Sequence, residues 1–330
     1  MAKLKYAKNI VYDTKPYSPE MMEKIKESQK EKDLKSTIKL TRLLWMDGDM
    51  VKGASIYMEC VWLWEGSTTK GTTEEPHVHE FDEVIGFIST KRENPRELDA
   101  EMEIWLGDEK HILKNSCLVY IPRGMKHCPL TFRQVNRPVF FFTLAPKGMY
   151  GRTSEGAKSP ASGKPEKPVF IPPEKDANGS RYAKYIITDT IPRPVDPKAP
   201  RPTMEGTRLL RLEDKVILGA FYADFVWIWK GSGTIAPGGH SHDWDEMFGL
   251  IGADREHERD LGGIVELTLG DEKHVLKNSC LVYVPGGLHH CPLEFKNIQK
   301  PTLCFTVGNT IEYTSIQKNK TSKSNEQGQK

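Results

Sequence analysis

The chain has 330 residues, of which 38% are hydrophobic and 28% charged, and its net charge is +2. This composition is typical of a globular protein of about two domains, and the small net charge gives no reason to expect nucleic acid or a membrane surface as a partner. No apolar run approaches the roughly 18 residues of a membrane-spanning helix. The six cysteines contain no CxxC pair and are too few for a disulfide scaffold. We therefore expect reduced thiols, no signal peptide and a cytoplasmic location.

A short helix is the first element that the sequence predicts. Ser18 is suited to its N-cap and Pro19 to its first helical position, while Met21, Met22 and Ile25 would form its buried face.

Strands dominate the prediction after this helix. Short runs rich in apolar, β-branched and aromatic residues occur at 61–64, 112–121 and 139–144. Gly-Asp pairs at 107–108 and 270–271 are typical of hairpin turns. Several short strands separated by turns indicate an all-β sandwich or barrel.

Internal repetition organises most of the chain. Residues 106–132 read LGDEKHILKNSCLVYIPRGMKHCPLTF and residues 269–295 read LGDEKHVLKNSCLVYVPGGLHHCPLEF, an offset of 163. Near the start of each copy, YAKNIVYDT at 6–14 pairs with YAKYIITDT at 182–190. A period this long, present twice, indicates duplicated domains and not a solenoid of short repeats.

The repeat also predicts the domain boundaries. We expect an N-terminal domain at 1–150, a linker rich in Gly, Pro, Ser and Lys at 151–178, and a C-terminal domain at 179–314. Residues 315–330 carry almost no apolar side chains, so we expect a disordered tail.

Three histidines and a glutamate recur at equivalent positions of the two copies. An HxH pair is followed by Glu after three residues, and a third His comes some 45 residues later, after a Pro-x-Gly step. Residues two apart on a strand share a face, so the first three side chains could enter one barrel interior if the strand continues. Three imidazoles and a carboxylate suit a first-row divalent metal, and the predicted ligands are His77, His79, Glu83, His127, His240, His242, Glu246 and His290.

This arrangement resembles the two sequence motifs of the cupin family, Gly-x5-HxH-x3-Glu and Pro-x-Gly-x2-His. Gly71 stands at the first glycine of copy one, whereas Thr234 replaces it in copy two. The remaining departures affect turns and supporting positions and are Ser116, Ser279, Thr131 and Glu294. The resemblance implies a bicupin: two tandem jelly-roll (double-stranded β-helix) barrels, each binding one divalent metal, with Fe, Mn, Zn, Ni, Co and Cu all possible.

Other conspicuous residues favour structural roles. His111 and His274 lie in the GDEKH turns and are interpreted as solvated hairpin histidines. Alternation along a strand points Cys128 and Cys291, which follow ligand histidines, away from the metal. The same parity gives Asp82 and Asp245 a supporting or surface role, and it favours core packing over a cavity wall for Trp62, Trp64, Trp227 and Trp229.

Function is less constrained by these residues than fold is. Four protein ligands would leave two positions of a six-coordinate metal for water, oxygen or a substrate with adjacent oxygens, such as a diketone, an enediol, a hydroxy acid or a catechol-like ring. Cupins include dioxygenases, decarboxylases, isomerases and non-catalytic binders. The two-domain oxalate decarboxylases carry an arginine three residues before HxH, where this chain has Glu74 and Pro237, which argues against a small dicarboxylate substrate.

Three hypotheses follow. The first is a metal-dependent enzyme, a dioxygenase or a lyase, that oxygenates a small oxygenated organic molecule or cleaves a carbon–carbon bond in it. The alternative is a non-catalytic bicupin that binds, stores or senses a metal-bound small molecule, and the third is a structural role with vestigial metals. The small-molecule substrate is the expected partner, and a homo-oligomer is possible.

Overall fold

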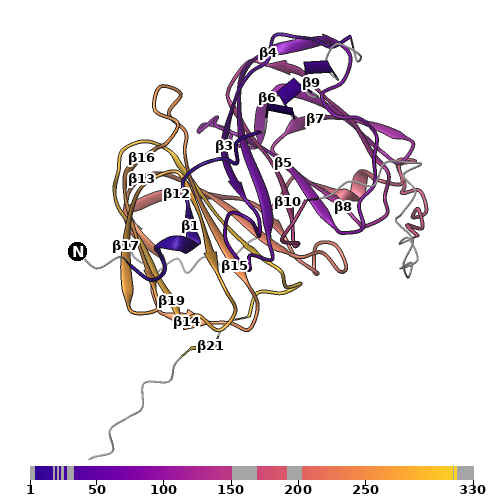
Figure 1. Ribbon diagram of the computed structural model, residues 1–330. Coiled ribbons are helices and arrows are strands. Elements are labelled where there is room, and N and C mark those ends of the chain that lie inside the picture. Colours follow the sequence, from indigo (N-terminus) through magenta and orange to yellow (C-terminus); the bar gives the residue numbers. More distant parts are fainter. Residues whose placement is uncertain are drawn as a thin grey trace, which may run out of the picture.

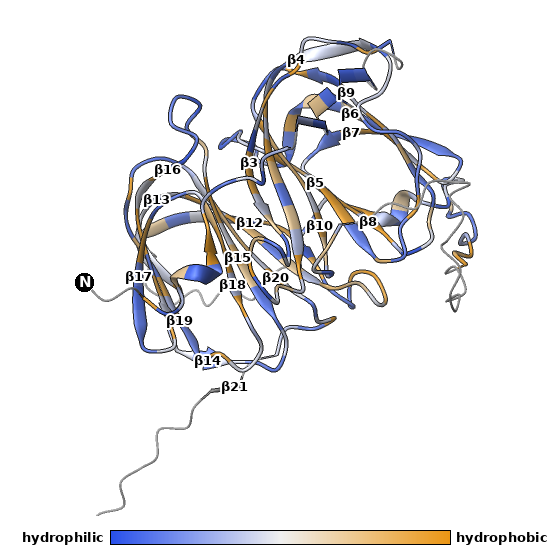
Figure 2. Ribbon diagram, viewed as in Figure 1, coloured by the Kyte–Doolittle hydropathy of each residue, from blue (hydrophilic) through white to orange (hydrophobic). Residues whose placement is uncertain are grey.

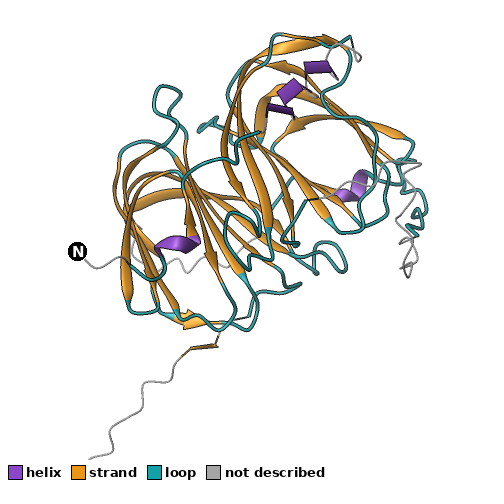
Figure 3. Ribbon diagram, in the orientation of Figure 1, coloured by secondary structure: helices purple, strands orange, loops and turns teal. Residues whose placement is uncertain are grey.

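The computed structural model describes residues 4–17, 33–150, 169–191, 203–314 and 316–317, together with six positions between 19 and 27. Two antiparallel sheets curl into two β-barrels that lie side by side (Figures 1 and 3). This architecture confirms the prediction of an all-β fold with two tandem barrels. None of the helices in the described part of the chain is long and apolar enough to cross a bilayer.

The first barrel is a ten-stranded sheet in which β11, β8, β5, β10, β4, β9, β6 and β7 are neighbours in that order, while β2 and β3 pair with β4. Its strands are β2 (Lys35–Ser36), β3 (Lys39–Met46), β4 (Tyr57–Lys70), β5 (Glu83–Ser89), β6 (Glu97–Leu106), β7 (Glu109–Asn115), β8 (Cys117–Ile121), β9 (His127–Val135), β10 (Val139–Ala145) and β11 (Ile186–Ile187).

The second barrel is an eleven-stranded sheet in which β1, β18, β15, β20, β13, β19, β14 and β21 are neighbours in that order. In addition, β12 pairs with β13, and β16 pairs with β17 and β19. Its strands are β1 (Ile10–Val11), β12 (Met204–Leu212), β13 (Tyr222–Ala236), β14 (His240–Ser241), β15 (Glu246–Gly252), β16 (Asp260–Leu269), β17 (Glu272–Asn278), β18 (Cys280–Val284), β19 (His290–Ile298), β20 (Thr302–Gly308) and β21 (Ile316–Gln317).

The segment at the start of each copy pairs with the barrel of the other copy. The 3-10 turn η1 (Ala7–Asn9) and β1 lie against β18 of the second barrel, whereas η2 (Ala183–Tyr185) and β11 lie against β8 of the first. Figure 1 shows the indigo N-terminal turn inside the orange half of the molecule. We call these segments the crossing arms, residues 4–14 and 180–190.

Burial explains why the strands differ in composition. Along β6, buried positions alternate with partly exposed ones, because one face meets the barrel interior and the other solvent. Every residue of β5 is buried, and the end of this strand meets the second barrel at Ser89. At that junction the rings of Phe142 and Phe225 stack with centroids 4.9 Å apart, and Trp227 Nε1 donates to the carbonyl of Ser89 at 3.0 Å. Hydrophobic residues accordingly concentrate on β5 and β10 in Figure 2.

The predicted strands at 61–64 and 139–144 and both hairpin turns are confirmed, whereas the run at 112–121 is divided at Ser116 between β7 and β8. The N-terminal helix is only partly testable, because Ser18, Met21 and Ile25 lie outside the described residues; Pro19 is helical, but Met22 is 43% exposed, so its predicted burial is wrong. The one N-terminal helical element with both ends described is the 3-10 turn η1. Part of the predicted tail forms β21, and residues 318–330 lie outside the described residues.

Candidate metal centres

The first cluster forms where two distant segments meet. His77 and His127 face each other across an isolated antiparallel bridge, in which each backbone N–H donates to the other's carbonyl at 3.1 Å. His127 is the first residue of β9, and Glu83 is the first residue of β5. The chain bends between His79 and Glu83, so the continuous strand assumed from the sequence is wrong, and the glutamate reaches the cluster from β5 instead.

The second cluster repeats this construction. His240 on β14 pairs in register with His290, the first residue of β19, and Glu246 is the first residue of β15.

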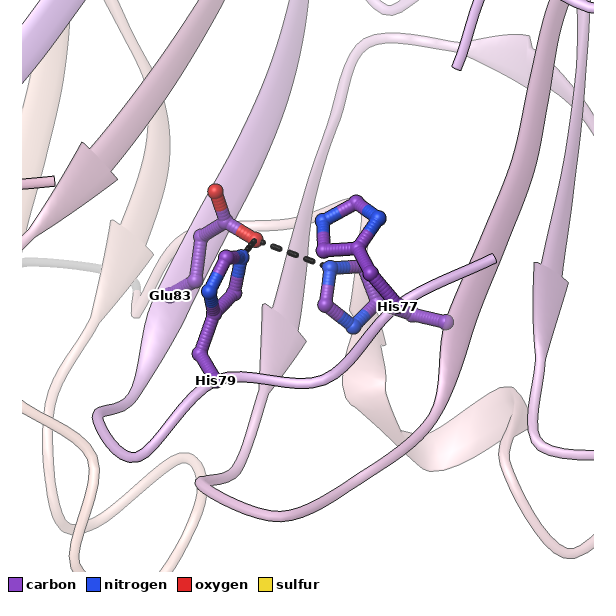
Figure 4. A group of neighbouring side chains, drawn as sticks. His77, His79 and Glu83 are labelled. Carbon is purple, nitrogen blue, oxygen red and sulfur yellow. Dashed lines mark ion pairs between the residues drawn. The ribbon is translucent and has the colours of Figure 1, made fainter. Parts of the chain in front are cut away.

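The structure brings all eight predicted ligands together in two groups of four. In each group the candidate ligand atoms lie within 4.8 Å of one another, and every residue is buried. Glu83 Oε2 lies 3.1 Å from His127 Nε2 and 3.4 Å from His79 Nε2. Figure 4 shows the glutamate and the imidazoles of this cluster pointing at a common centre. In the second cluster Glu246 Oε2 lies 3.0 Å from His290 Nε2.

Backbone carbonyls orient the imidazoles. The Nδ1 atoms of five ligand histidines lie 2.6–3.2 Å from carbonyl oxygens, and these pairs are His77–Glu75, His127–Met125, His240–Gly238, His242–Trp244 and His290–Leu288. A carbonyl can only accept, so the proton belongs on Nδ1, and the lone pair of Nε2 faces the cluster. Outer hydrogen bonds of this kind fix the tautomer of metal-binding histidines.

The two acidic residues before the ligand glutamates hold the loops that carry the last histidines. Asp82 Oδ1 accepts a hydrogen bond of 2.8 Å from the backbone N–H of Arg123, and Asp245 Oδ1 accepts one of 2.8 Å from that of Gly286. This agrees with the supporting role expected for both residues.

The charge state of the clusters also suits a cation. Burial alone would raise the pKa of Glu83, but the close approach of His127 and His79 outweighs burial and lowers that pKa. The pKa of Glu246 is lowered in the same way, against its burial, by His242 and His290. Each site therefore contains a carboxylate that is ionised at neutral pH.

A metal ion at the centre of each cluster would bind carboxylate oxygens and Nε2 atoms that are buried close together. The carboxylate oxygens of Glu83 and Nε2 of His127 and of His290 are buried without a hydrogen bond. With the proton of the neutral imidazole on Nδ1, the lone pair of Nε2 and a carboxylate oxygen about 3 Å away attract each other only through a cation between them, which is either an added proton or a metal ion. The donor set of three imidazoles and one carboxylate fits a first-row divalent metal. Each barrel thus has a site for one divalent metal.

Aromatic side chains cover each cluster, and their place there was not predicted from the sequence. In the first barrel the ring of Phe81 stacks on His79 at 4.6 Å, and Tyr150 lies 4.7 Å from Tyr57 and 6.0 Å from Phe81. The equivalent residues of the second barrel are Trp244, Tyr313 and Tyr222, with Trp244 stacked on His242 at 3.6 Å. We call these two sets the aromatic caps.

The signal for the caps was present in the sequence. Phe81 and Trp244, like Tyr150 and Tyr313, are separated by the same 163 residues as the ligands.

Other predicted roles can be compared with the structure. Core packing is confirmed for the tryptophans, because Trp62 and Trp227 are fully buried. The prediction of a solvated His274 is wrong: its side chain is 4% exposed, because the crossing arm covers that hairpin. All six cysteines are free, as expected, and all six are buried.

Comparison of the sequence with known protein families and with curated proteins finds no match. Among solved structures, a single-residue mutant of Bacillus subtilis oxalate decarboxylase aligns with a TM-score of 0.50 and 12% identity, covering 86% of this chain and 77% of that one. A second oxalate decarboxylase structure, concerned with proton-coupled electron transfer, aligns over the same shares with 12% identity and a TM-score of 0.48.

At this identity the likeness concerns the fold. The chain therefore shares a fold of two tandem β-barrels with that solved oxalate decarboxylase, and each of its barrels contains a cluster of three histidines and one glutamate that suits a divalent metal.

Proposed function

We infer that the protein is a metal-dependent enzyme acting on a small oxygenated organic molecule, by dioxygenase-type oxygenation or by cleavage of a carbon–carbon bond. One observation carries this proposal: in both barrels a buried four-ligand cluster lies directly beneath an aromatic cap that contains a hydroxyl. A site that only retains a metal does not require an aromatic cover with a hydroxyl beside the ligands.

The metal, when bound, would polarise oxygen atoms of a substrate that coordinates through them. The chain's own residues would do the rest. The aromatic caps exclude water and offer flat surfaces to a planar molecule. The lowered pKa values of Glu83 and Glu246 keep both carboxylates ionised, so that they bind as anions.

The caps also bear on the substrate class. Glu74 and Pro237 stand where the sequence motif of oxalate decarboxylases has arginine, and the first cap consists of Phe81, Tyr57 and Tyr150. An aromatic wall favours a planar organic compound such as a catechol, an enediol or a diketone over a compact dianion. Lys147 lies 4.9 Å from the Phe81 ring, so a single negative charge on that compound would be tolerated in the first site.

The test begins with elemental analysis of the purified protein, where about two equivalents of metal per chain are expected. Oxygen uptake and carbon dioxide release are then measured with catechols, enediols, diketones and hydroxy acids. The double variant His77→Ala plus His240→Ala should lose both metals and all turnover, whereas His257→Ala, at an exposed histidine outside the clusters, should lose neither.

Binding without turnover of any of these compounds would favour the non-catalytic alternative, a bicupin that stores or senses a metal-bound small molecule. Absence of metal, with none taken up on titration, would overturn both.

A further inference from the structure

We propose that Tyr150 and Tyr313 are substrate-contacting residues, one in each site, whose hydroxyls donate a hydrogen bond to an oxygen of the molecule bound at the metal. This inference rests on the proposed function and names the residues that would recognise its substrate.

The two tyrosines occupy equivalent places although their surroundings differ in sequence. Tyr150 follows β10 in GMY, and Tyr313 follows β20 in IEY, at the offset of 163 that relates the metal ligands. Both are partly exposed, whereas the ligands beneath them are buried, so the tyrosines stand between the clusters and the outside.

Each hydroxyl contacts a ligand histidine at its metal-facing nitrogen. Tyr150 Oη lies 3.2 Å from His79 Nε2, and Tyr313 Oη lies 2.9 Å from His240 Nε2. His240 Nδ1 faces the carbonyl of Gly238 at 3.2 Å, so its Nε2 is the acceptor and the tyrosine is the donor.

This contact determines what the hydroxyl does once a metal is bound. The lone pair of Nε2 is then committed to the metal and no longer accepts a proton donor. The hydroxyl stays beside the metal, because the ring that carries it remains packed in its cap, with its centroid 5.1 Å from that of Tyr222 in the second site. An oxygen of a coordinated substrate would lie within reach of this hydroxyl as an acceptor, and its partial negative charge strengthens the hydrogen bond.

The two sites present the hydroxyl differently. Tyr150 contacts the second histidine of its HxH pair, whereas Tyr313 contacts the first. In the second barrel Trp244 Nε1 donates to Thr314 Oγ1 at 3.2 Å, which fixes the residue next to Tyr313. The two sites therefore differ, and each tyrosine is tested in protein that keeps only one of them.

The probe is 4-nitrocatechol, whose two adjacent oxygens chelate a metal and whose absorption changes on binding. In zinc-loaded protein carrying His127→Ala only the second site remains. There, Tyr313→Phe should weaken probe binding about five- to tenfold, the effect of losing one hydrogen bond. Tyr150→Phe in the same background is the matched control and should change it less than twofold. In protein carrying His290→Ala only the first site remains. There, Tyr150→Phe should weaken probe binding about five- to tenfold, and Tyr313→Phe should change it less than twofold.

Zinc affinity is the second measurement. Because the phenol competes with the metal for Nε2, each Tyr→Phe change should leave zinc affinity at its own site unchanged or raise it a few-fold. A tenfold loss of zinc affinity would mean that the tyrosine is a metal ligand or a structural support, and would overturn the inference.

Unchanged probe binding in Tyr313→Phe would likewise overturn this inference while leaving the proposed function intact. Failure of the probe to bind zinc-loaded wild-type protein would count against both.

Discussion

The carboxylate of Glu272, in the second barrel, accepts a hydrogen bond of 2.9 Å from the backbone N–H of Tyr6, 266 residues away in the sequence. Lys5 N–H donates to the same carboxylate at 2.6 Å. In the first barrel Glu109 accepts from the backbone N–H of Arg181 at 2.8 Å in the same manner. Each crossing arm is thus held by a glutamate of the other copy, which makes the two barrels mutually dependent.

Replacing the glycine beneath the N-terminal arm should release that arm. Gly270 has φ +62°, and a Cβ there would lie 2.7 Å from the ring of Tyr6. Lys8 is already exposed, but Gly270→Ala should free the backbone around it for cleavage by trypsin, and mass spectrometry follows that cleavage. Gly219→Ala is the control, because Gly219 has a similar φ of +80° but open space around it. Both variants carry a backbone cost of about 1–2 kcal/mol, so equal cleavage rates would show that the ring contact does not hold the arm.

Acid should release the same arm. The backbone hydrogen bond from Tyr6 lowers the pKa of Glu272, so the docked arm favours the ionised carboxylate. Its contribution is complete above the ordinary carboxyl pKa of about 4.3 and is lost as the pH falls through the lowered value. Amide hydrogen exchange of Tyr6, corrected for the intrinsic rate, should thus accelerate below about pH 4. In Glu272→Ala the exchange should be fast throughout; a pH step of the same size in that variant would assign the effect to another group.

Most of the site was predictable because ligands repeat at fixed spacing. The crossing of the arms was not, because β8 (CLVYI) and β18 (CLVYV) are almost identical and offer the same edge to a two-residue strand. Which copy an arm joins depends on non-local geometry, which the local sequence does not contain. Tyr150 and Tyr313 were missed for another reason: their neighbours have diverged, so each tyrosine appears to belong to a linker or a chain end.

The glutamates should decide how much metal each barrel retains. Glu246→Gln keeps the shape of the side chain but removes the anion that faces His290 at 3.0 Å. We expect the metal content to fall from about two equivalents per chain to about one after dialysis at neutral pH, measured by elemental analysis. Glu266→Gln is the control, because Glu266 is a carboxylate of the same barrel that pairs with Lys273 outside the cluster. Retention of both metals in Glu246→Gln would show that three imidazoles suffice.

The C-terminal strand should support the second metal site but not the first. In β21 the backbone of Gln317 pairs with that of His240, and Ile316 pairs with Ser241, so this strand braces the segment that carries a ligand. A chain ending at Thr314 loses this pairing, and we expect its second site to bind zinc about tenfold more weakly, as when an outer support of a metal ligand is removed. A chain ending at Gln317 is the matched control and should bind as the full chain does. Competition with a chromophoric chelator, in a His127→Ala background that leaves only the second site, measures the difference. Equal affinities of the two shortened chains would mean that His240 is positioned by its pairing with His290 alone.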